Sequence, residues 1–330
     1  MMVKNSFSFA PHEETGVQEE IRFVLKDFRK GEFALLKVLG PGERLELSRD
    51  KLDGHLNYKY KYQTRSEGKW KDISKYQYLP MEAVSEEGLK YIYLHEENSP
   101  FLVVVFQAMA KTPGYNYIKT LDEFPVSKLF IKDDYGPKPT GATYYLGESK
   151  SMGVAHKVQA LIERVRTHNG LVKDRVVCAG SSKGGYASIF HSFLGGYGFA
   201  VAGGPQIYLG DYLGKNLKNL ESVSTPIYQY ITGGLSEEDK SWANGLMTGM
   251  IEERLVTSPA RPRKMIHVGK GEPHYRAHVK PFSEFMAAMG YEKLDLNLGS
   301  YDTHKELAVH FPIFLQQKIR QIMKTGVVIL

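Results

Sequence analysis

The stretch 176–187 constrains the fold of this chain more than any other part of the sequence. A short apolar run ends there in small residues, and an apolar segment with helical periodicity follows, which predicts a strand, a tight turn and a helix. The turn, Gly180-Ser181-Ser182-Lys183-Gly184, fits the pattern G-x-S-x-G, in which the central serine lies on a sharp, strained strand-to-helix turn. Ser182 is therefore predicted to project its hydroxyl above the sheet edge as a nucleophile, while Ser181 points elsewhere.

The same pentapeptide has other interpretations. G-x-S-x-G also occurs by chance, and turns rich in glycine and serine serve packing or phosphate binding. A Walker A loop is excluded because Gly184, and not serine or threonine, follows Lys183. A dinucleotide-binding fingerprint is excluded because no G-x-G-x-x-G opens a helix here. The strand and helix predicted on either side favour the nucleophile.

Strand and helix patterns alternate along residues 99–330. Strands are predicted at 101–106, 128–131, 144–146, 199–202, 265–269 and 294–298. Helices are predicted at 154–165 and 304–323, the second kinked or split by Pro312. Alternation of this kind indicates a parallel sheet with right-handed crossovers. Together with the serine turn, it predicts an α/β-hydrolase-type, mostly parallel sheet flanked by helices.

Two regions depart from this alternation of strand and helix patterns. Residues 1–98 contain short alternating and aromatic runs separated by glycine-containing turns, which predicts a small β-rich N-terminal domain. In it, Tyr58, Tyr60 and Tyr62 alternate with lysines, which favours a buried tyrosine face, the alternative being an aromatic platform for sugar rings. Residues 205–260 are predicted to form a cap insertion over the site, with a helix starting near Ser236.

Composition narrows the classes of function. The net charge of +6 is spread along the 330 residues, so we expect no nucleic-acid partner. The single Cys178 lies in a predicted buried strand, which indicates an inert thiol and favours a reducing, cytoplasmic location. The chain contains no apolar run of transmembrane length, and residues 1–7 lack a signal-peptide pattern. No Cys/His ligand spacing appears, so we expect neither metal nor cofactor.

A serine hydroxyl needs a base to remove its proton, and the base needs a third group to orient it. In this fold class the chain order is serine, acid, histidine. His304 follows the last predicted strand and is the predicted base, while Glu272 follows the strand before and is the predicted acid. Asp302 is the alternative acid because it neighbours His304 in the sequence. A surface histidine and a solvated glutamate are the non-catalytic interpretations.

Two backbone N–H groups are expected to bind the oxyanion, one from Lys183 and one from Gln107 or Ala108. For the Lys183 side chain, a salt bridge on the helix surface is favoured over an anchor for substrate. Substrate-binding side chains are expected in the cap, and the alternative is that they pack it. These candidates are Gln206, Tyr208, Tyr212 and Trp242.

Three blocks carry a resemblance to a known family: residues 180–186, residues 130–136 with 144–147, and residues 204–213. They resemble the group that joins an accessory Sec system protein of streptococci and staphylococci with capsular polysaccharide biosynthesis proteins of the XcbB/CpsF type. The resemblance covers roughly residues 98–325, and the block around Ser182 is its most specific part.

The resemblance implies an α/β-hydrolase fold with a Ser-Glu-His triad on Ser182, Glu272 and His304. It also implies O-acetyl transfer to N-acetylglucosamine on exported glycoproteins, or work on surface polysaccharide. Residues 1–98 contain no matching motif, so acceptor and substrate do not transfer.

These observations predict a serine esterase or O-acyltransferase that works through an acyl-enzyme. Its substrate would be a small-molecule or glycan ester, most specifically an O-acyl group of surface carbohydrate or glycoprotein. The alternative is a non-catalytic partner protein in a capsule or accessory secretion complex, and a peripheral association with such machinery is expected in either case. A nucleic-acid binder would rest on the pI of about 9.0 alone.

Overall fold

The computed structural model describes residues 6–48, 51–52, 57–217 and 222–326. Residues 1–5, part of the segment without a signal-peptide pattern, lie outside the described residues. None of the described helices is both long enough and apolar enough to cross a membrane.

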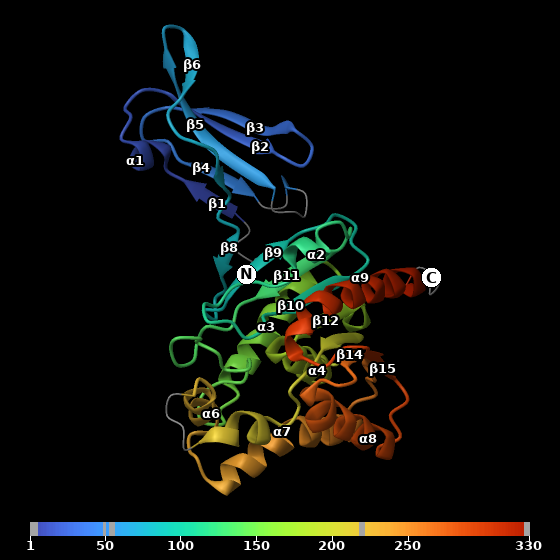
Figure 1. The fold of residues 1–330 in the computed structure, drawn as a ribbon. Coiled ribbons are helices and arrows are strands. Elements are labelled where there is room, and N and C mark those ends of the chain that lie inside the picture. Colours follow the sequence, from blue (N-terminus) through green and yellow to red (C-terminus); the bar gives the residue numbers. More distant parts are fainter. Residues whose placement is uncertain (1–5, 49–50, 53–56, 218–221, 327–330) are drawn as a thin grey trace.

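An eight-stranded sheet with the order β15-β14-β13-β12-β10-β11-β9-β8 forms the centre of the larger part (Figure 1). Strands β10 to β15 pair in parallel, while β9 joins β11 and β8 joins β9 in antiparallel fashion. The strands are β8 (Glu82–Val84), β9 (Lys90–Leu94), β10 (Leu102–Phe106), β11 (Ser127–Ile131), β12 (Val176–Ser181), β13 (Phe199–Gly203), β14 (Arg263–Gly269) and β15 (Leu294–Gly299). The predicted fold class, a mostly parallel α/β-hydrolase-type sheet flanked by helices, is confirmed.

Helices cover both faces of this sheet, which explains the uninterrupted apolar run of β10. Successive side chains of a strand point to opposite faces. Accordingly Val103 and Val105 pack in the cluster that contains α9 residues, while Leu102 and Val104 pack in the cluster that contains α3 residues. The main helices are α2 (Ile118–Leu121), α3 (Gly153–His168), α4 (Lys183–Gly195), α8 (Lys280–Ala288) and α9 (Leu307–Gly326).

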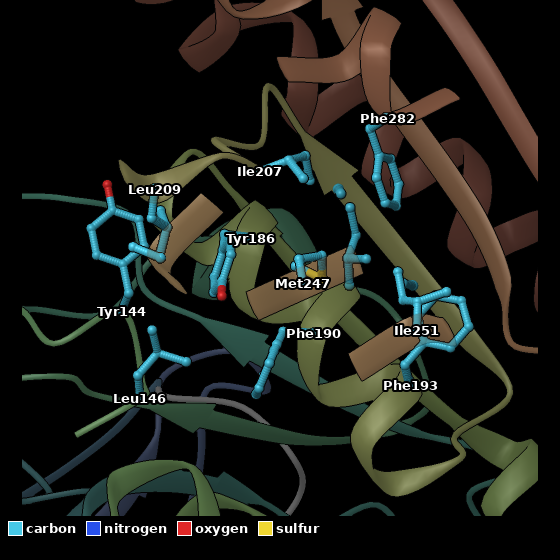
Figure 2. Packing of buried hydrophobic residues seen from close by; sticks show 14 of the residues in the cluster. Tyr144, Leu146, Tyr186, Phe190, Phe193, Ile207, Leu209, Met247, Ile251 and Phe282 are labelled. Atoms are coloured by element: carbon cyan, nitrogen blue, oxygen red, sulfur yellow. The ribbon is translucent and has the colours of Figure 1, made fainter. Parts of the chain in front are cut away.

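The segment between β13 and β14 is helical, with α5 (Leu209–Leu213), α6 (Ser224–Thr232) and α7 (Glu237–Thr257). Helix α7 begins where the sequence predicts a helix start, because the Ser236 side chain accepts from the Asp239 N–H and the Asp239 side chain accepts in return. Figure 2 shows side chains of α4, α7 and the segment after β13 gathered in one core, which fixes the insertion to the helix behind the serine.

The N-terminal part contains an antiparallel sheet with the order β3-β2-β5-β6, to which β7 pairs through β5, and a two-stranded sheet of β1 and β4. Its elements are β1 (Ser6–Phe9), α1 (Pro11–Thr15), β2 (Ile21–Asp27), β3 (Glu32–Leu39), β4 (Leu45–Ser48), β5 (Tyr58–Ser66), β6 (Lys69–Asp72) and β7 (Gln77–Tyr78). The rings of Tyr58, Tyr60 and Tyr62 are buried in its core, so the predicted tyrosine core face is confirmed. The expected domain boundary near residue 98 stays a prediction, and sheet membership changes earlier, between β7 and β8.

One local strand prediction is wrong. The segment 144–146 is a turn and not a strand, because Tyr144 and Tyr145 have φ values of 54° and 59°. Their apolar character reflects burial of a compact loop, which a strand pattern imitates. Of the two effects predicted at Pro312, a kink or a split of the closing helix, the split does not occur, since α9 continues through that residue. It starts at Leu307, after a single 3₁₀ turn at His304–Glu306.

Candidate active site

Ser182 lies between β12 and α4 with a φ of 56° and a ψ of −120°, a conformation that a residue with a side chain rarely adopts. A hydrogen bond of 2.7 Å from its N–H to the Gly203 carbonyl holds this turn. A Cβ on Gly180 would lie 2.5 Å from the Gly184 carbonyl oxygen, and one on Gly184 would lie 2.3 Å from the Phe106 carbonyl oxygen. The two glycines of the motif are thus required by backbone packing around the serine.

The structure brings Ser182, His304 and Glu272 together from three separate loops. His304 Nε2 lies 3.0 Å from Ser182 Oγ, and His304 Nδ1 lies 2.5 Å from Glu272 Oε1. With Nδ1 donating to the carboxylate, Nε2 carries the lone pair and accepts from the serine hydroxyl. This geometry is that of nucleophile, base and orienting acid.

Glu272 is fully buried and held as a carboxylate. Burial alone would raise its pKa, but hydrogen bonds from His274 and His304 outweigh it and lower the pKa of Glu272 to about 2. The Gly269 N–H, 3.3 Å from Oε2, contributes further. Asp302 instead places its carboxylate against the backbone of Gly271, where an added Cβ would lie 1.8 Å from Asp302 Oδ1.

His274 is a further member of the site whose part sequence reasoning left undefined. Its Nδ1 lies 2.8 Å from Glu272 Oε1 and 2.9 Å from His304 Nδ1, so one carboxylate oxygen serves two imidazoles. The signal in the sequence is the spacing Glu272-Pro273-His274, which places a histidine two positions after the predicted acid. Among the described residues, these three also form the one His/Cys/Asp/Glu set with ligand atoms close enough for a metal, all within 4.8 Å of one another. Their hydrogen bonds to one another already account for the arrangement.

The backbone groups expected at the oxyanion site are engaged by side chains. The Gln107 N–H donates to the Tyr145 hydroxyl at 2.6 Å, and the Ala108 N–H donates to Asn116 Oδ1 at 2.8 Å. Either group serves an oxyanion only after its partner has moved. Lys183, as the first residue of α4, has an N–H without an acceptor in its own helix.

The Lys183 side chain lies beneath the serine turn and not on the helix surface, so the favoured surface salt bridge is wrong. Its Nζ lies 2.9 Å from Asp133 Oδ2, and both side chains are buried. Burial lowers the pKa of Lys183, although Asp133 opposes this shift. Asp133 also accepts from the Thr143 N–H at 2.9 Å and from the Thr143 hydroxyl at 2.7 Å. The ion pair thereby anchors the loop that carries Tyr145 to the Gln107 N–H.

Gln206 is the one expected substrate-binding residue in contact with the nucleophile. It is fully buried, and its Nε2 donates to Ser182 Oγ at 2.7 Å. The Tyr144 hydroxyl lies 3.5 Å from its Oε1, which orients the amide. The serine oxygen therefore accepts from an amide while it donates to His304.

The other expected substrate-binding residues lie further out. The rings of Tyr212 and His274 are 5.4 Å apart, and the Tyr208 N–H donates to His278 Nδ1 at 3.3 Å. Trp242 lies on α7, half-buried, with the Lys150 ammonium 5.7 Å from its ring centre. In the contacts of the described residues, no hydrogen bond or ring contact joins Trp242 to the triad.

Ser181 and Cys178 behave as expected. The Ser181 hydroxyl points to the Tyr117 hydroxyl, 2.5 Å away, and not toward His304. Cys178 is buried in β12, and burial raises the pKa of its thiol. Neither residue is therefore a competing nucleophile.

No protein-family model matches this chain, and no curated protein matches it in sequence. Solved structures do match. The capsule O-acetyltransferase of Neisseria meningitidis serogroup A has a TM-score of 0.60 at 16% identity, over 72% of this chain and 94% of that one. The glycosylation-associated protein complex of Streptococcus agalactiae has a TM-score of 0.61 at 13% identity, over 97% of this chain and 62% of that one.

The fluorophosphonate-binding serine hydrolase F of Staphylococcus aureus has a TM-score of 0.55 at 13% identity, over 73% of this chain and 96% of that one. All three structures match this chain at 16% sequence identity or less. They show that the chain has the α/β-hydrolase fold.

Proposed function

We propose that this protein is a serine acyl-transfer enzyme with Ser182 as nucleophile, His304 as base and Glu272 as the acid that orients the base. The observation that carries the proposal is the hydrogen-bonded series from Ser182 Oγ through His304 to the buried Glu272. Glu272, the acid of this series, is ionised at neutral pH because its pKa is lowered to about 2. Such a series activates a hydroxyl that is otherwise a weak nucleophile.

The reaction follows from this arrangement. Ser182 Oγ attacks the ester carbonyl carbon while its proton passes to His304 Nε2, and Glu272 stabilises the imidazolium. The tetrahedral intermediate collapses, the leaving alcohol takes that proton, and an acyl-enzyme remains. Water or a sugar hydroxyl then attacks the acyl carbon, again losing its proton to His304, and Ser182 is regenerated. Hydrolysis and transfer differ only in this second acceptor.

We assign the oxyanion to two donors, the Lys183 N–H and the Gln206 side-chain amide. The oxyanion is the carbonyl oxygen of the carbon that bonds to Ser182 Oγ, and Gln206 Nε2 already lies 2.7 Å from Ser182 Oγ. The amide therefore needs only a small shift to follow the developing charge. The backbone donors at Gln107 and Ala108 are satisfied by Tyr145 and Asn116, which favours this assignment over the expected one.

The substrate we propose is an O-acyl, specifically O-acetyl, group on carbohydrate or glycoprotein. Support comes from the Gln206 amide at Ser182, from the rings of Tyr208 and Tyr212 further out beside His278 and His274, and from the likeness to a capsule O-acetyltransferase. A cytoplasmic location and a peripheral association with capsule or secretion machinery belong to this proposal.

The alternative is a non-catalytic partner protein in such machinery. It is favoured by the match of 97% of this chain to a glycosylation-associated complex. In that case the serine turn would be architecture alone.

A fluorophosphonate probe separates the two. The proposal expects covalent labelling of the wild type and loss of labelling in Ser182→Ala, with ester turnover reduced by about 10³-fold or more. Ser181→Ala is the matched control and keeps the label, because its hydroxyl faces Tyr117. An unlabelled, folded wild type that also fails to turn over short acyl esters favours the non-catalytic partner.

The substrate class is tested by measuring acetyl release and acetyl transfer on O-acetylated sugars beside long-chain esters. Preference for the long-chain esters refutes carbohydrate as the substrate class.

A further inference from the structure

One face of the N-terminal sheet carries cations and rings together. The inward side chains of β5 are tyrosines, so Lys59, Lys61 and Arg65 point outward. The register sets Lys26 opposite Lys59 and Arg22 opposite Gln63, which brings the outward residues of β2 onto the same face. We call the following set the outer face: Arg22, Lys26, Phe28, Phe33, Leu36, Val38, Lys59, Lys61, Arg65, Trp70, Tyr76 and Tyr78 (sheet in Figure 1).

The apolar members of the outer face are unusually open to solvent. Phe33 is 60% exposed and Tyr78 is 66% exposed. Phe28, Leu36 and Val38 are exposed as well. Contiguous exposed apolar surface rimmed by charge is a mark of an interaction site.

The cations of the outer face lie against rings. Lys59 Nζ lies 4.8 Å from the ring centre of Phe28 and 4.4 Å from that of Tyr78, and the guanidinium of Arg22 lies 4.6 Å from that of Trp70. One carboxylate, Asp72, neutralises Lys61 at 2.7 Å. Within the described part of the chain, no ion pair neutralises Lys26, Lys59 or Arg65. The face therefore holds a surplus of positive charge ready for an anionic ligand.

The outer face continues toward the candidate active site. Tyr78 also lines a cavity of about 690 Å³ whose lining includes Tyr115, Asn116 and Tyr117. Asn116 binds the Ala108 N–H, and Tyr117 meets the hydroxyl of Ser181, next to the nucleophile. A chain lying along β5 and past Tyr78 would thus reach the loops beside Ser182.

We propose that the outer face binds an acidic polysaccharide, a chain of sugars bearing carboxylate or phosphate, and presents it toward the Ser182 site. Alternate residues of a strand are about 7 Å apart. Cations and rings repeated at that spacing suit a polymer of repeating anionic sugars, whose apolar faces stack on aromatic rings. The inference rests on the proposed function for the identity of the chain, since carbohydrate is what an acyl-transfer site of this kind would modify. The positive surplus itself excludes a neutral glycan as the preferred ligand.

Binding is measured with the whole protein and polygalacturonate, with neutral dextran, a single-stranded DNA oligonucleotide and phosphatidylglycerol vesicles as the other arms. We expect binding to polygalacturonate that weakens with added salt, and none to dextran. Lys26→Gln with Lys59→Gln should weaken it about tenfold. Tyr78→Ala should weaken the binding of polygalacturonate that remains at high salt, because salt does not screen the stacking of sugars on the ring.

The matched control removes two lysines from the opposite side of the same sheet. Lys69 and Lys71 of β6 alternate with Trp70 and Asp72, so Lys69→Gln with Lys71→Gln leaves the outer face intact and should leave binding unchanged. Equal loss in both double variants, tighter binding of DNA or vesicles, or no polygalacturonate binding at low salt overturns the proposal. Probe labelling of Ser182 is read separately, so loss of labelling refutes the catalytic assignment and not this surface.

Discussion

Lys183 beneath the nucleophile and the lysines of the outer face are held in opposite ways. Lys183 is buried against Asp133, and that carboxylate accepts two further hydrogen bonds from Thr143. Lys26 and Lys59 lie against aromatic rings at the surface. A buried cation remains charged only where a carboxylate compensates the cost of its burial, whereas an exposed cation remains available to a ligand. The charge of Lys183 thus serves to fix the geometry of the loop beneath Ser182, whereas the charges of Lys26 and Lys59 are proposed to serve ligand binding.

The largest effects should come from the fixed region, at the acid of the triad. Glu272→Gln replaces the carboxylate that orients His304 and should lower kcat by about 10³-fold or more. Asp302→Asn should change kcat little, because the Asp302 carboxylate faces Gly271. Steady-state kinetics on a short acyl ester decide between them. Strong loss in Asp302→Asn with retention in Glu272→Gln would reverse the assignment.

The buried ion pair itself provides the most direct test of the comparison. Lys183→Met leaves Asp133 buried without its cation and should lower the free energy of unfolding by about 3–5 kcal/mol. Lys59→Met on the outer face should change it by about 0.5 kcal/mol or less. Chemical denaturation measures both. The double variant Lys183→Met with Asp133→Asn should recover part of the loss, and equal stability of the two single variants would refute the comparison.

The amide beside the serine should give the next largest effect on rate. Gln206→Glu keeps the shape of the side chain but removes the donor to Ser182 Oγ, so kcat should fall by about 10²-fold with little change in KM. Affinity for a trifluoromethyl ketone, which forms an oxyanion on binding, should fall in parallel. The exposed Gln229 supplies the control, Gln229→Glu, which adds the same charge away from the site. A change in KM alone would make Gln206 a substrate contact and not an oxyanion donor.

The sequence predicted Ser182, Glu272 and His304 as candidate nucleophile, acid and base because each follows the carboxyl end of a strand that is recognisable as an apolar run. In the structure these three side chains are in hydrogen-bond contact, and their catalytic roles are the proposal made above. The sequence did not predict that the Tyr145 and Asn116 side chains engage the N–H groups of Gln107 and Ala108. The Tyr145 contact depends on a loop with left-handed backbone at Tyr144 and Tyr145. An apolar run gives no sign of backbone handedness.

The partner of Lys183 was beyond the sequence for a related reason. Asp133 lies 50 positions earlier, just after β11, which β10 separates from β12, and nothing local marks it as buried. The outer face was predicted only in part. The alternation on β5 predicted that its tyrosines and lysines lie on opposite faces of the sheet. The rings that lie against Lys59 and Lys61 are Phe28 after β2, Tyr76 before β7 and Tyr78 in β7, and only the pairing of β2 and β7 with β5 brings them there. Local sequence patterns thus predict helices and strands, whereas the residues that contact a charged side chain are determined by how the strands pair.

The smallest effect we expect is a pH dependence of stability at His278, another buried group beside the site. Burial, and then the neighbouring His274, lowers the pKa of His278 to about 4 from its ordinary 6.5, although Asp211 opposes the shift. A lowered pKa in the folded state means that protonation favours unfolding. The stabilisation is therefore complete above pH 6.5 and is lost as the pH falls toward 4. His278→Asn keeps an acceptor for the Tyr208 N–H but does not titrate, so its unfolding free energy should fall less than that of the wild type across this window, by about 3 kcal/mol at most. Urea unfolding of both proteins at several pH values measures the difference, with the exposed His168→Asn as control. Parallel pH curves for wild type and His278→Asn would show that this imidazole is not held neutral by burial.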